Sequence, residues 1–488
     1  WHLLSWVKRR PGVMLLLNFL RVSRMRHKPS CVVQKLKASG QNVQAKVTVM
    51  APVSSHKPMP PLSGVAFVKK LAKLSKISRN QSAHFALAVS GGADSLSLMA
   101  LAAVVREKNN HWDFSVLTVN HGLRPAAVQE TRYVSKLAKA MGLPCKILTH
   151  KGAVPENDIQ SAARNIRYGL MSEWCVKNKV TYLVTAHHLE DQAETFLLRL
   201  ARGSGLDGLS GMQSIRNYEG VALLRPFLDV PRECLHQTTA KAGLEPISDP
   251  SNSNRRFARV RIRNKMDLLS EEGVTAARLA DTAGRLLQAR QALEQVTENF
   301  MQAAVRLDEY GIAYLTYASL RDQPEDILRR TINRLLTPYG GYPPRAESVQ
   351  RILDEVFLKP RPPKEGGKTI NGFVLRFRSE GLLIFREISG LPEPVIIKPG
   401  GVCVWDNGIS IRVAKSSVLK GMLQIKPLGS EGLKAIRKLG NDVPKNLPAA
   451  ALHALPSVWL TYRKKSSLLA VRGVLEHADI EFQDVFRL

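Results

Sequence analysis

Short apolar runs alternate with longer amphipathic segments between about residues 83 and 188. The runs predict buried strands, because four to eight apolar residues bounded by turn residues are typical of such strands, whereas the segments between them carry the period of helices. The predicted order is strand His84–Ser90, helix Ser95–Lys108, strand Phe114–Asn120, helix Pro125–Met141, strand Cys145–His150, helix Ser161–Asn178 and strand Tyr182–His187. This alternation predicts an α/β fold, a parallel sheet with helices on both faces, in which ligands bind at the carboxyl ends of the strands.

The pattern changes after about residue 270. Helices are predicted at Gly273–Arg306, Pro324–Leu336 and Arg345–Phe357, short strands at Phe373–Arg378, Leu382–Arg386 and Leu468–Val471, and a linker at Leu391–Pro399. A further helix, Val65–Ser78, precedes the first strand. We therefore expect a basic, disordered extension over residues 1–62, an α/β domain over 63–270, a mainly helical domain over 271–390 and a small α+β domain over 391–488.

Composition narrows the classes of protein that fit the chain. Its 488 residues are 44% hydrophobic and 23% charged, close to the averages for soluble globular proteins, so a fibrous or mostly disordered chain is excluded. The five cysteines are widely spaced and no Cys-x-x-Cys pair occurs, which argues against a disulfide scaffold, a zinc ribbon and a cysteine-ligated iron–sulfur cluster. The longest apolar run near the start is far short of the roughly 20 residues that cross a bilayer, so no membrane span is predicted.

Positive charge is concentrated at the beginning of the sequence. The formal net charge is +30, and 16 Lys or Arg residues but no Asp or Glu precede Asp94. Three interpretations of this basic stretch stay open: an organellar targeting peptide, a disordered arm that binds nucleic acid, or translated sequence upstream of the true start. The rest of the chain still carries 55 basic against 41 acidic residues, which favours a polyanionic partner.

The clearest chemical motif is a glycine pair between the first predicted strand and the helix after it. The segment consists of Ser90, Gly91, Gly92, Ala93, Asp94 and Ser95. Glycines let the backbone approach a ligand, and the amides of a helix start favour an anion, so the segment predicts a pyrophosphate cradle with Asp94 as a candidate Mg²⁺ ligand. It lacks the Lys-Ser/Thr of a Walker P-loop, which disfavours a kinase or GTPase. The alternative is a Gly-Gly turn in which Asp94 and Ser95 cap the helix.

Two carboxylates follow the fourth predicted strand. Asp191 and Glu194 lie three residues apart on the first turns of a predicted helix and therefore share one face. At the end of a strand they are placed to hold a metal, or to orient an amine and take its proton. The alternative is a helix start that favours negative charge, with His187 and His188 as ordinary packed histidines.

Two further segments are dense in arginine. Residues 163–168 contain Arg164 and Arg167, and residues 199–209 combine two arginines with three glycines. A guanidinium is a planar fork suited to carboxylate or phosphate. The alternatives are a solvated helix face for Arg164 and Arg167, and an ordinary loop for the glycines.

Together these motifs resemble the N-type ATP pyrophosphatase, or PP-loop, family, whose members use a Ser-Gly-Gly-x-Asp-Ser loop to form an adenylated intermediate and release pyrophosphate. Within that family their order is similar to that of the tRNA(Ile)-lysidine synthases. The likeness rests on Ser90–Ser95, Val119–Pro125, Ala163–Tyr168, His187–Thr195, Arg202–Leu206, Arg225–Asp229 and Asp249–Asn252. It extends in register over about residues 85–265 and is weaker in the two later domains.

The resemblance implies an adenine nucleotide α-hydrolase-like fold and a ligase that modifies tRNA. ATP and Mg²⁺ would bind at Ser90–Ser95, and the wobble cytidine of an isoleucine tRNA with a CAU anticodon would be adenylated at its C2 carbonyl oxygen. Free L-lysine would then displace AMP to give lysidine. Asp94 would serve the metal and phosphates, Arg164 would hold lysine or the activated base, and Asp191 with Glu194 would engage the lysine amine and the activation step. The two domains after residue 270 would bind the tRNA.

Alternatives remain open at this point. A sulfur-inserting tRNA thiolase of the same family shares the loop, although such enzymes commonly use Cys-x-x-Cys pairs. A non-catalytic RNA-binding protein that retains a nucleotide fold is a candidate from another class, and ATP-dependent pyrophosphate release would exclude it. We expect the bacterial cytoplasm as the location, with organellar targeting by the basic extension as the alternative, and a homodimer is one candidate for the oligomeric state.

Overall fold

The computed structural model describes residues 59–484, apart from residues 79, 109–110, 123–125, 153–158, 248–254, 338–340, 358–364, 407, 416–418, 420, 444–446 and 464. Most of the predicted basic extension lies outside the described residues, as do residues 123–125 and 249–252 of the motifs above. In the described part of the chain, no helix is both long and apolar enough to span a membrane.

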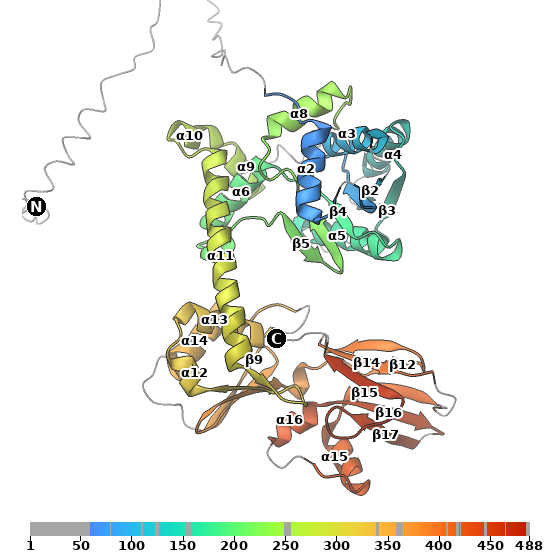
Figure 1. Cartoon of the computed structure of the whole chain (residues 1–488), viewed down its shortest axis with the longest axis vertical. Helices are drawn as coiled ribbons and strands as arrows, with labels where there is room; N and C mark the ends of the chain where they lie inside the picture. Colours follow the sequence, from blue (N-terminus) through green and yellow to red (C-terminus); the bar gives the residue numbers. More distant parts are fainter. Residues whose placement is uncertain are drawn as a thin grey trace, which may run out of the picture. The chain divides into compact units, whose positions relative to one another are not determined.

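The first part of the chain is built on a six-stranded sheet (Figure 1). Its order is β3 (Cys145–Thr149), β2 (Trp112–Asn120), β1 (Ala83–Ala88), β4 (Tyr182–Val184), β6 (Val221–Leu224) and β5 (Ile215–Tyr218). The first five strands in this order are parallel, which confirms the predicted α/β fold class. The edge strand β5 pairs antiparallel with β6, and this hairpin is an addition to the predicted sheet.

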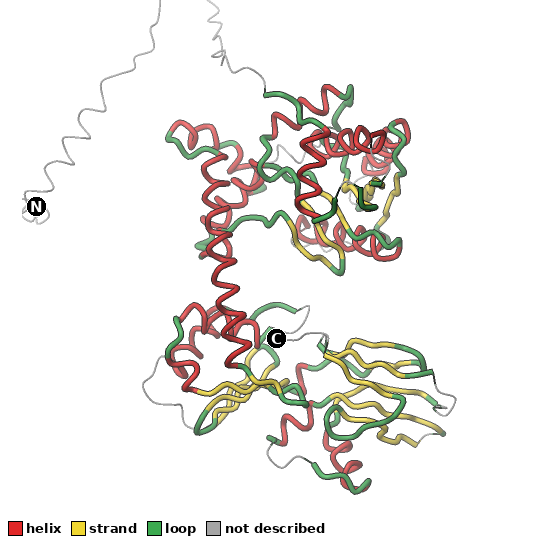
Figure 2. Tube along the Cα trace, in the orientation of Figure 1, coloured by secondary structure: helices red, strands yellow, loops and turns green. Residues whose placement is uncertain are grey.

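Helices cover both faces of this sheet because β1 sends alternate side chains to opposite sides. Phe85 and Leu87 are fully buried in a core that they share with α2 (Gly64–Ser75), α3 (Ala93–Lys108), α4 (Ala126–Ala140) and α8 (Arg232–Lys241). Ala86 packs on the other face, in a second core with α5 (Ile159–Lys177). Figure 2 shows these helices around the strands, so the layered arrangement predicted from the sequence is present.

A set of helices leads away from the sheet after β4. They are α6 (Leu189–Leu200), α7 (Leu206–Leu209), α9 (Ala258–Arg263), α10 (Met266–Glu271) and α11 (Ala276–Ala304). α6 packs against the long helix α11 through the buried residues Ala193, Phe196, Leu279 and Ala283. Thr275 caps α11, since its hydroxyl accepts a hydrogen bond from the Arg278 amide at 3.3 Å.

The segment after α11 combines helices with a sheet that the sequence predicted only in part. The antiparallel order is β7 (Arg306–Leu307), β8 (Ala313–Thr316), β11 (Gly381–Arg386), β10 (Phe373–Phe377) and β9 (Gly366–Ile370). Helices α12 (Tyr317–Arg321), α13 (Glu325–Leu335) and α14 (Ala346–Ile352), the last continuing into η3 (Leu353–Phe357), contribute to one core with this sheet. β10 and β11 are the two predicted strands, whereas β7, β8 and β9 are too short or too polar to stand out in the pattern.

Two antiparallel sheets form the last part of the chain, after the short helix η4 (Ile388–Gly390). One has the order β12 (Val395–Ile397), β15 (Met422–Pro427), β16 (Pro456–Tyr462), β17 (Lys465–Val471), and the other β13 (Val402–Trp405), β14 (Ile409–Val413), β18 (Ile480–Asp484). Two helices, α15 (Gly429–Lys438) and α16 (Ala449–Ala454), accompany them. The predicted linker at Leu391–Pro399 is wrong in part, because β12 forms within it as an edge strand, a position that tolerates flanking prolines.

Candidate active site

The loop between β1 and α3, Ser90–Ser95, is here named the phosphate loop. The Ser95 hydroxyl accepts a hydrogen bond from the Ser90 amide at 3.2 Å and donates one to the Gly92 carbonyl at 2.9 Å. Gly91 has a φ of +92°, and a Cβ atom there would lie 2.4 Å from Cδ1 of Ile247. Both the backbone and its neighbour therefore require glycine. The first amides of α3 have no acceptor within the helix and suit an anionic group.

Asp94 lies in the first turn of α3 and is surrounded by basic side chains. Its Oδ1 is 3.3 Å from Nε2 of His236 and 3.8 Å from Nε of Arg232, both on α8. Its Oδ2 is 3.8 Å from Nε2 of His188, which precedes α6. Oδ1 is buried, yet no described group donates a hydrogen bond to it. A buried oxygen of this kind needs a partner, so Asp94 retains capacity for a further ligand.

His188 links Asp94 to the carboxylates that follow β4. Its ring is nearly fully buried, with Nδ1 2.9 Å from Oε2 of Glu190 and Nε2 3.5 Å from Oδ2 of Asp191. Burial disfavours the charged imidazolium, but the hydrogen bond to Glu190 and the charges of Asp191 and Asp94 together outweigh it and raise the pKa of His188. The structure thus brings Asp94 and Asp191, which are far apart in the sequence, to one histidine.

Asp191 and Glu194 share a side of α6, as their spacing predicts, but they differ in what they touch. Asp191 accepts a hydrogen bond from the His188 amide at 3.1 Å. Burial opposes its ionisation, yet the neighbouring charges of His188 and Arg259 and the hydrogen bond from the His188 amide lower its pKa below the usual value. Glu194 is fully buried, and its Oε1 accepts a hydrogen bond from Nε of Arg263 at 2.7 Å. Its Oε2 lies 3.4 Å from Nε of Arg259, so Glu194 fastens α9 to α6.

Arg164 lies on α5, where its guanidinium carbon is 5.1 Å from the ring centre of Tyr168. Burial lowers the pKa of His187 to about 3, and the charges of Arg225, Arg164 and Arg167 add to this effect against the opposing charge of Asp191. His187 is therefore neutral near pH 7, and its Nδ1 is 2.8 Å from Oγ1 of Thr185. The charges of the predicted arginine segment and of Asp191 thus both act on His187, whereas Glu194 contacts Arg263 and Arg259.

The segment at residues 199–209, which is rich in arginine and glycine, folds back on itself through hydrogen bonds of Arg199. Nη1 of Arg199 donates hydrogen bonds to the carbonyls of Gly208 and Gly211 at 2.6 and 2.9 Å. Asp207 of α7 forms ion pairs at 3.1 Å with Arg290 of α11 and Arg330 of α13. These contacts favour the loop interpretation of the glycines and connect this segment to the helices that follow.

Four residues that lie at the site were not predicted from the sequence. They are Arg232 and His236 on α8, and Arg259 and Arg263 on α9. For the second pair a local signal exists, because residues 255–263 contain five arginines. No local sequence signal marks Arg232 and His236, because only the packing of α8 against α3 brings these side chains to Asp94.

Comparison with known proteins places the chain in a family. The model of the PP-loop domain family matches residues 65–268, a range that includes Asp94, Arg164, Asp191 and Glu194. A tRNA(Ile)-lysidine synthase of Ruegeria pomeroyi is 35% identical over 378 residues, which cover 76% of this chain and 85% of that protein. The chain belongs to the tRNA(Ile)-lysidine synthase family. The family resemblance carried by the motifs is therefore confirmed.

Other members of the tRNA(Ile)-lysidine synthase family match over different spans. The synthase of Methylobacterium nodulans is 38% identical over 314 residues, 62% of this chain and 89% of that protein. The synthase of Wolbachia pipientis is 33% identical over 401 residues, 80% of this chain and 88% of that protein. Among solved structures, a U34-tRNA thiolase from Methanococcus maripaludis is 19% identical with a TM-score of 0.40, over 46% of this chain and 80% of that chain.

Proposed function

We propose that this chain is an ATP-dependent ligase that joins free L-lysine to C2 of the wobble cytidine in an isoleucine tRNA with a CAU anticodon. The products would be lysidine in the tRNA, AMP and pyrophosphate. One observation carries the proposal: in a member of this family, the phosphate loop and Asp191 meet at the carboxyl edge of the parallel sheet, joined through His188. Ligation through an adenylated base needs the phosphate site and an amine-binding carboxylate side by side.

ATP would bind with its phosphates on the phosphate loop, where the first amides of α3 favour negative charge. The buried Oδ1 of Asp94, which lacks a hydrogen bond among the described residues, fits Mg²⁺. This ion takes one or two protein carboxylates and completes its shell with phosphate oxygens and water. When bound, it would neutralise charge that develops on the phosphates.

Asp191 would hold the lysine ε-amine. Its lowered pKa keeps the carboxylate ionised near pH 7, so it stabilises the positive charge that develops on the nitrogen as the amine attacks C2. The bond between C2 and its oxygen then breaks, AMP leaves with that oxygen, and the nitrogen gives up a proton to the Asp191 carboxylate. His188, with its raised pKa, would offset negative charge next to Asp94. Glu194 would act as a positioning residue, because Arg259 lies beside both it and Asp191.

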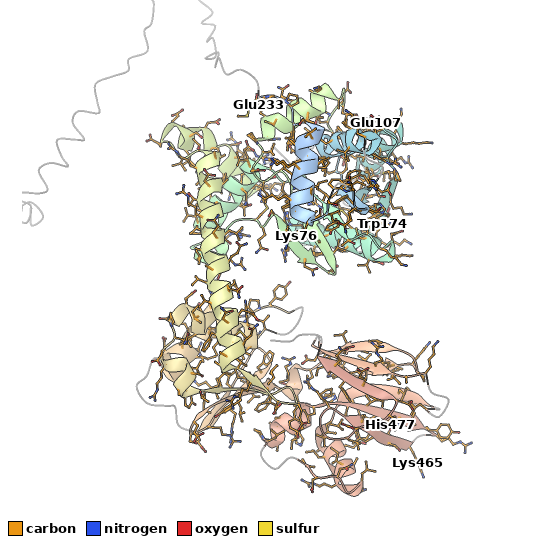
Figure 3. The ribbon with its side chains drawn as sticks, in the orientation of Figure 1. Lys76, Glu107, Trp174, Glu233, Lys465 and His477 are labelled. Atoms are coloured by element: carbon orange, nitrogen blue, oxygen red, sulfur yellow. The ribbon has the colours of Figure 1, made fainter. Side chains whose placement is uncertain are left out.

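The tRNA would meet a chain that carries an excess of positive charge outside its first 93 residues as well. Outside the first 93 residues 55 basic residues face 41 acidic ones, and neutralisation of phosphates dominates nucleic-acid affinity. We assign tRNA recognition to residues 271–390 and 391–488. α15 carries Lys434, Arg437 and Lys438. Arg463 lies in the turn after β16, and Lys465, labelled in Figure 3, begins β17. The bacterial cytoplasm and a homodimer stay predictions.

A sulfur-inserting thiolase is the less supported alternative. The three relatives above that are more than 30% identical to this chain are lysidine synthases, and the sequence contains no Cys-x-x-Cys pair. A free amine is thus the nucleophile that we favour over a sulfur donor.

Pyrophosphate exchange tests the order of the two steps. With ATP, Mg²⁺, labelled pyrophosphate and unmodified tRNA, the protein should form labelled ATP without lysine, because the base is activated before the amine arrives. A matched transcript with uridine in place of the wobble cytidine should support no exchange. Exchange that needs lysine and no tRNA would contradict the proposal, since the amino acid rather than the base would then be adenylated.

A further inference from the structure

The segment that contains α8 is fastened to the backbone of the phosphate loop. The hydroxyl of Thr239 donates a hydrogen bond to the Ala93 carbonyl at 2.7 Å, and the amide of Ile247 donates one to the Gly91 carbonyl at 2.9 Å. α8 shares a core with α3 and is located in Figure 3 by its labelled Glu233. The segment from α8 to Ile247 therefore forms a second wall beside the phosphate loop, and its side chains are held in place relative to that loop.

The first turn of α8 is also held from the side of α6. Oε2 of Glu190 accepts a hydrogen bond from the Arg232 amide at 2.9 Å and lies 2.9 Å from Nδ1 of His188. One carboxylate oxygen thus joins the residue that begins α8 to the histidine that links Asp94 with Asp191. The position of Arg232 is therefore set before any ligand binds, which lowers the cost of binding one.

The side chain of Arg232 keeps hydrogen-bond donors that no described residue uses. Its Nε donates to Nε2 of His236 at 3.2 Å and lies 3.8 Å from Oδ1 of Asp94, beyond hydrogen-bond distance. Among the described residues, none accepts a hydrogen bond from Nη1 or Nη2, and 38% of the side chain is exposed. An open guanidinium edge of this kind suits a phosphate group, which accepts two parallel hydrogen bonds.

The nucleotide expected on the neighbouring loop supplies such a phosphate group. Adenylation forms a bond between the C2 oxygen of the cytidine and the α-phosphorus of ATP, and the bond from that phosphorus to the bridging oxygen breaks. The electron pair of the broken bond stays on the bridging oxygen, so negative charge develops on the pyrophosphate as it leaves. A cation beside the two outer phosphates stabilises this charge most strongly while the bond breaks.

We propose that Arg232 binds the two outer phosphates of ATP and stabilises them as they leave as pyrophosphate, with His236 as the positioning residue that holds the guanidinium. The inference rests on the proposed function, which places ATP on the phosphate loop and releases pyrophosphate. Arg232 thereby becomes a catalytic contact that no sequence motif indicated. A nucleotide phosphate matches this side chain better than an RNA phosphate, because α8 is fastened to the phosphate loop itself.

The first test measures nucleotide binding by isothermal titration calorimetry, with Mg²⁺ and without tRNA. ATP and AMP share the nucleoside and the α-phosphate, but AMP lacks the outer phosphates. Arg232→Gln should weaken the affinity for ATP and for inorganic pyrophosphate by about 10- to 100-fold, the range expected for charge-assisted hydrogen bonds, and leave the affinity for AMP within about twofold. Arg232→Lys keeps the charge without the planar fork and should recover part of the loss. Lys241→Gln, at the exposed far end of α8, is the matched control and should change none of the three affinities.

The second test follows the leaving group during the reaction. In tRNA-dependent pyrophosphate exchange without lysine, Arg232→Gln should raise the KM for pyrophosphate by about 10- to 100-fold and leave the KM for tRNA within about twofold. His236→Ala should raise the KM for pyrophosphate by only about 2- to 10-fold, because it removes a single acceptor that orients the guanidinium. His236→Gln, whose amide oxygen can accept the same hydrogen bond, should recover most of that loss.

Three results would overturn the assignment. Equal losses of affinity for AMP and ATP would give Arg232 a structural role only. Unchanged affinities for ATP and pyrophosphate in Arg232→Gln would show that this side chain does not contact the outer phosphates. A raised KM for tRNA, with the affinity for ATP unchanged, would assign Arg232 to an RNA phosphate instead. If the unaltered protein binds neither ATP nor pyrophosphate, the proposed function itself fails, which is a distinguishable result.

Discussion

Gly91→Ala adds one methyl group at the point where the phosphate loop is most confined. The backbone there has a φ of +92°, and a left-handed conformation of this kind costs a residue with a Cβ about 1–2 kcal/mol. The new Cβ would lie 2.4 Å from Cδ1 of Ile247 and 3.3 Å from Cγ2 of Val134. Overpacking a buried position costs about 1–3 kcal/mol, so the free energy of unfolding should fall by about 2–5 kcal/mol in total.

Thermal denaturation and a second substitution measure the contributions of the strained backbone and of the contact with Ile247. For a domain of about 200 residues, each kcal/mol shifts the Tm by about 2–4 °C, so Gly91→Ala should lower the Tm by about 4–20 °C. Ile247→Ala removes the side chain that the new methyl group meets. The combined variant should therefore lose less than the sum of the single losses, by about 1 kcal/mol or more. Strictly additive losses, or a Gly91→Ala variant with the Tm of the unaltered protein, would refute this account of the loop.

Four further results are expected. Asp94→Asn should abolish tRNA-dependent pyrophosphate exchange and change the Tm by less than about 2 °C, because the carboxylate is needed for Mg²⁺ rather than for packing; full exchange would remove Asp94 from the mechanism. Glu194→Gln should speed hydrogen exchange in α9, since its two arginine partners lose a buried counter-charge; protection equal to that of the unaltered protein would contradict this. The pKa of His187 is lowered from 6.5 to about 3. As the pH falls from about 7 to 3, the unfolded chain therefore binds a proton at this histidine that the folded chain does not bind, and the free energy of unfolding decreases. His187→Gln should thus lose less stability between pH 7 and pH 4, which urea unfolding at each pH will measure, and parallel curves would refute the assignment. Charge reversal of both Arg463 and Lys465 to Glu should weaken tRNA binding and reduce its salt dependence by about two counterions; unchanged filter binding would place the tRNA elsewhere.

The parallel sheet could be predicted from the sequence because its strands are buried and its helices amphipathic. The same topology accounts for the part of the site that was foreseen. Asp94 follows β1 and Asp191 follows β4, and β1 pairs directly with β4, so the two carboxylates reach the same edge. The hydrophobic pattern of the sequence was sufficient to predict a functional side chain where that side chain lies next to the end of a strand.

The rest of the site depends on contacts that no local pattern encodes. His236 reaches Asp94 only because α8 packs on α3, and Glu194 meets Arg263 only because α9 returns to α6. The spacing of Asp191 and Glu194 predicted that they share one face of a helix, but it did not predict that they contact different partners. Likewise, β12 forms in a segment rich in proline because the neighbouring strand β15 supplies the hydrogen bonds that define it.

Nucleoside mass spectrometry of the reacted tRNA detects the product of the proposed ligation itself. The purified protein would be incubated with ATP, Mg²⁺, free lysine and unmodified isoleucine tRNA that carries a CAU anticodon. If the chain is this ligase, the wobble cytidine will be converted to lysidine only when ATP and lysine are both present. An unchanged cytidine after complete turnover of ATP, or a sulfur-containing base in its place, would contradict it.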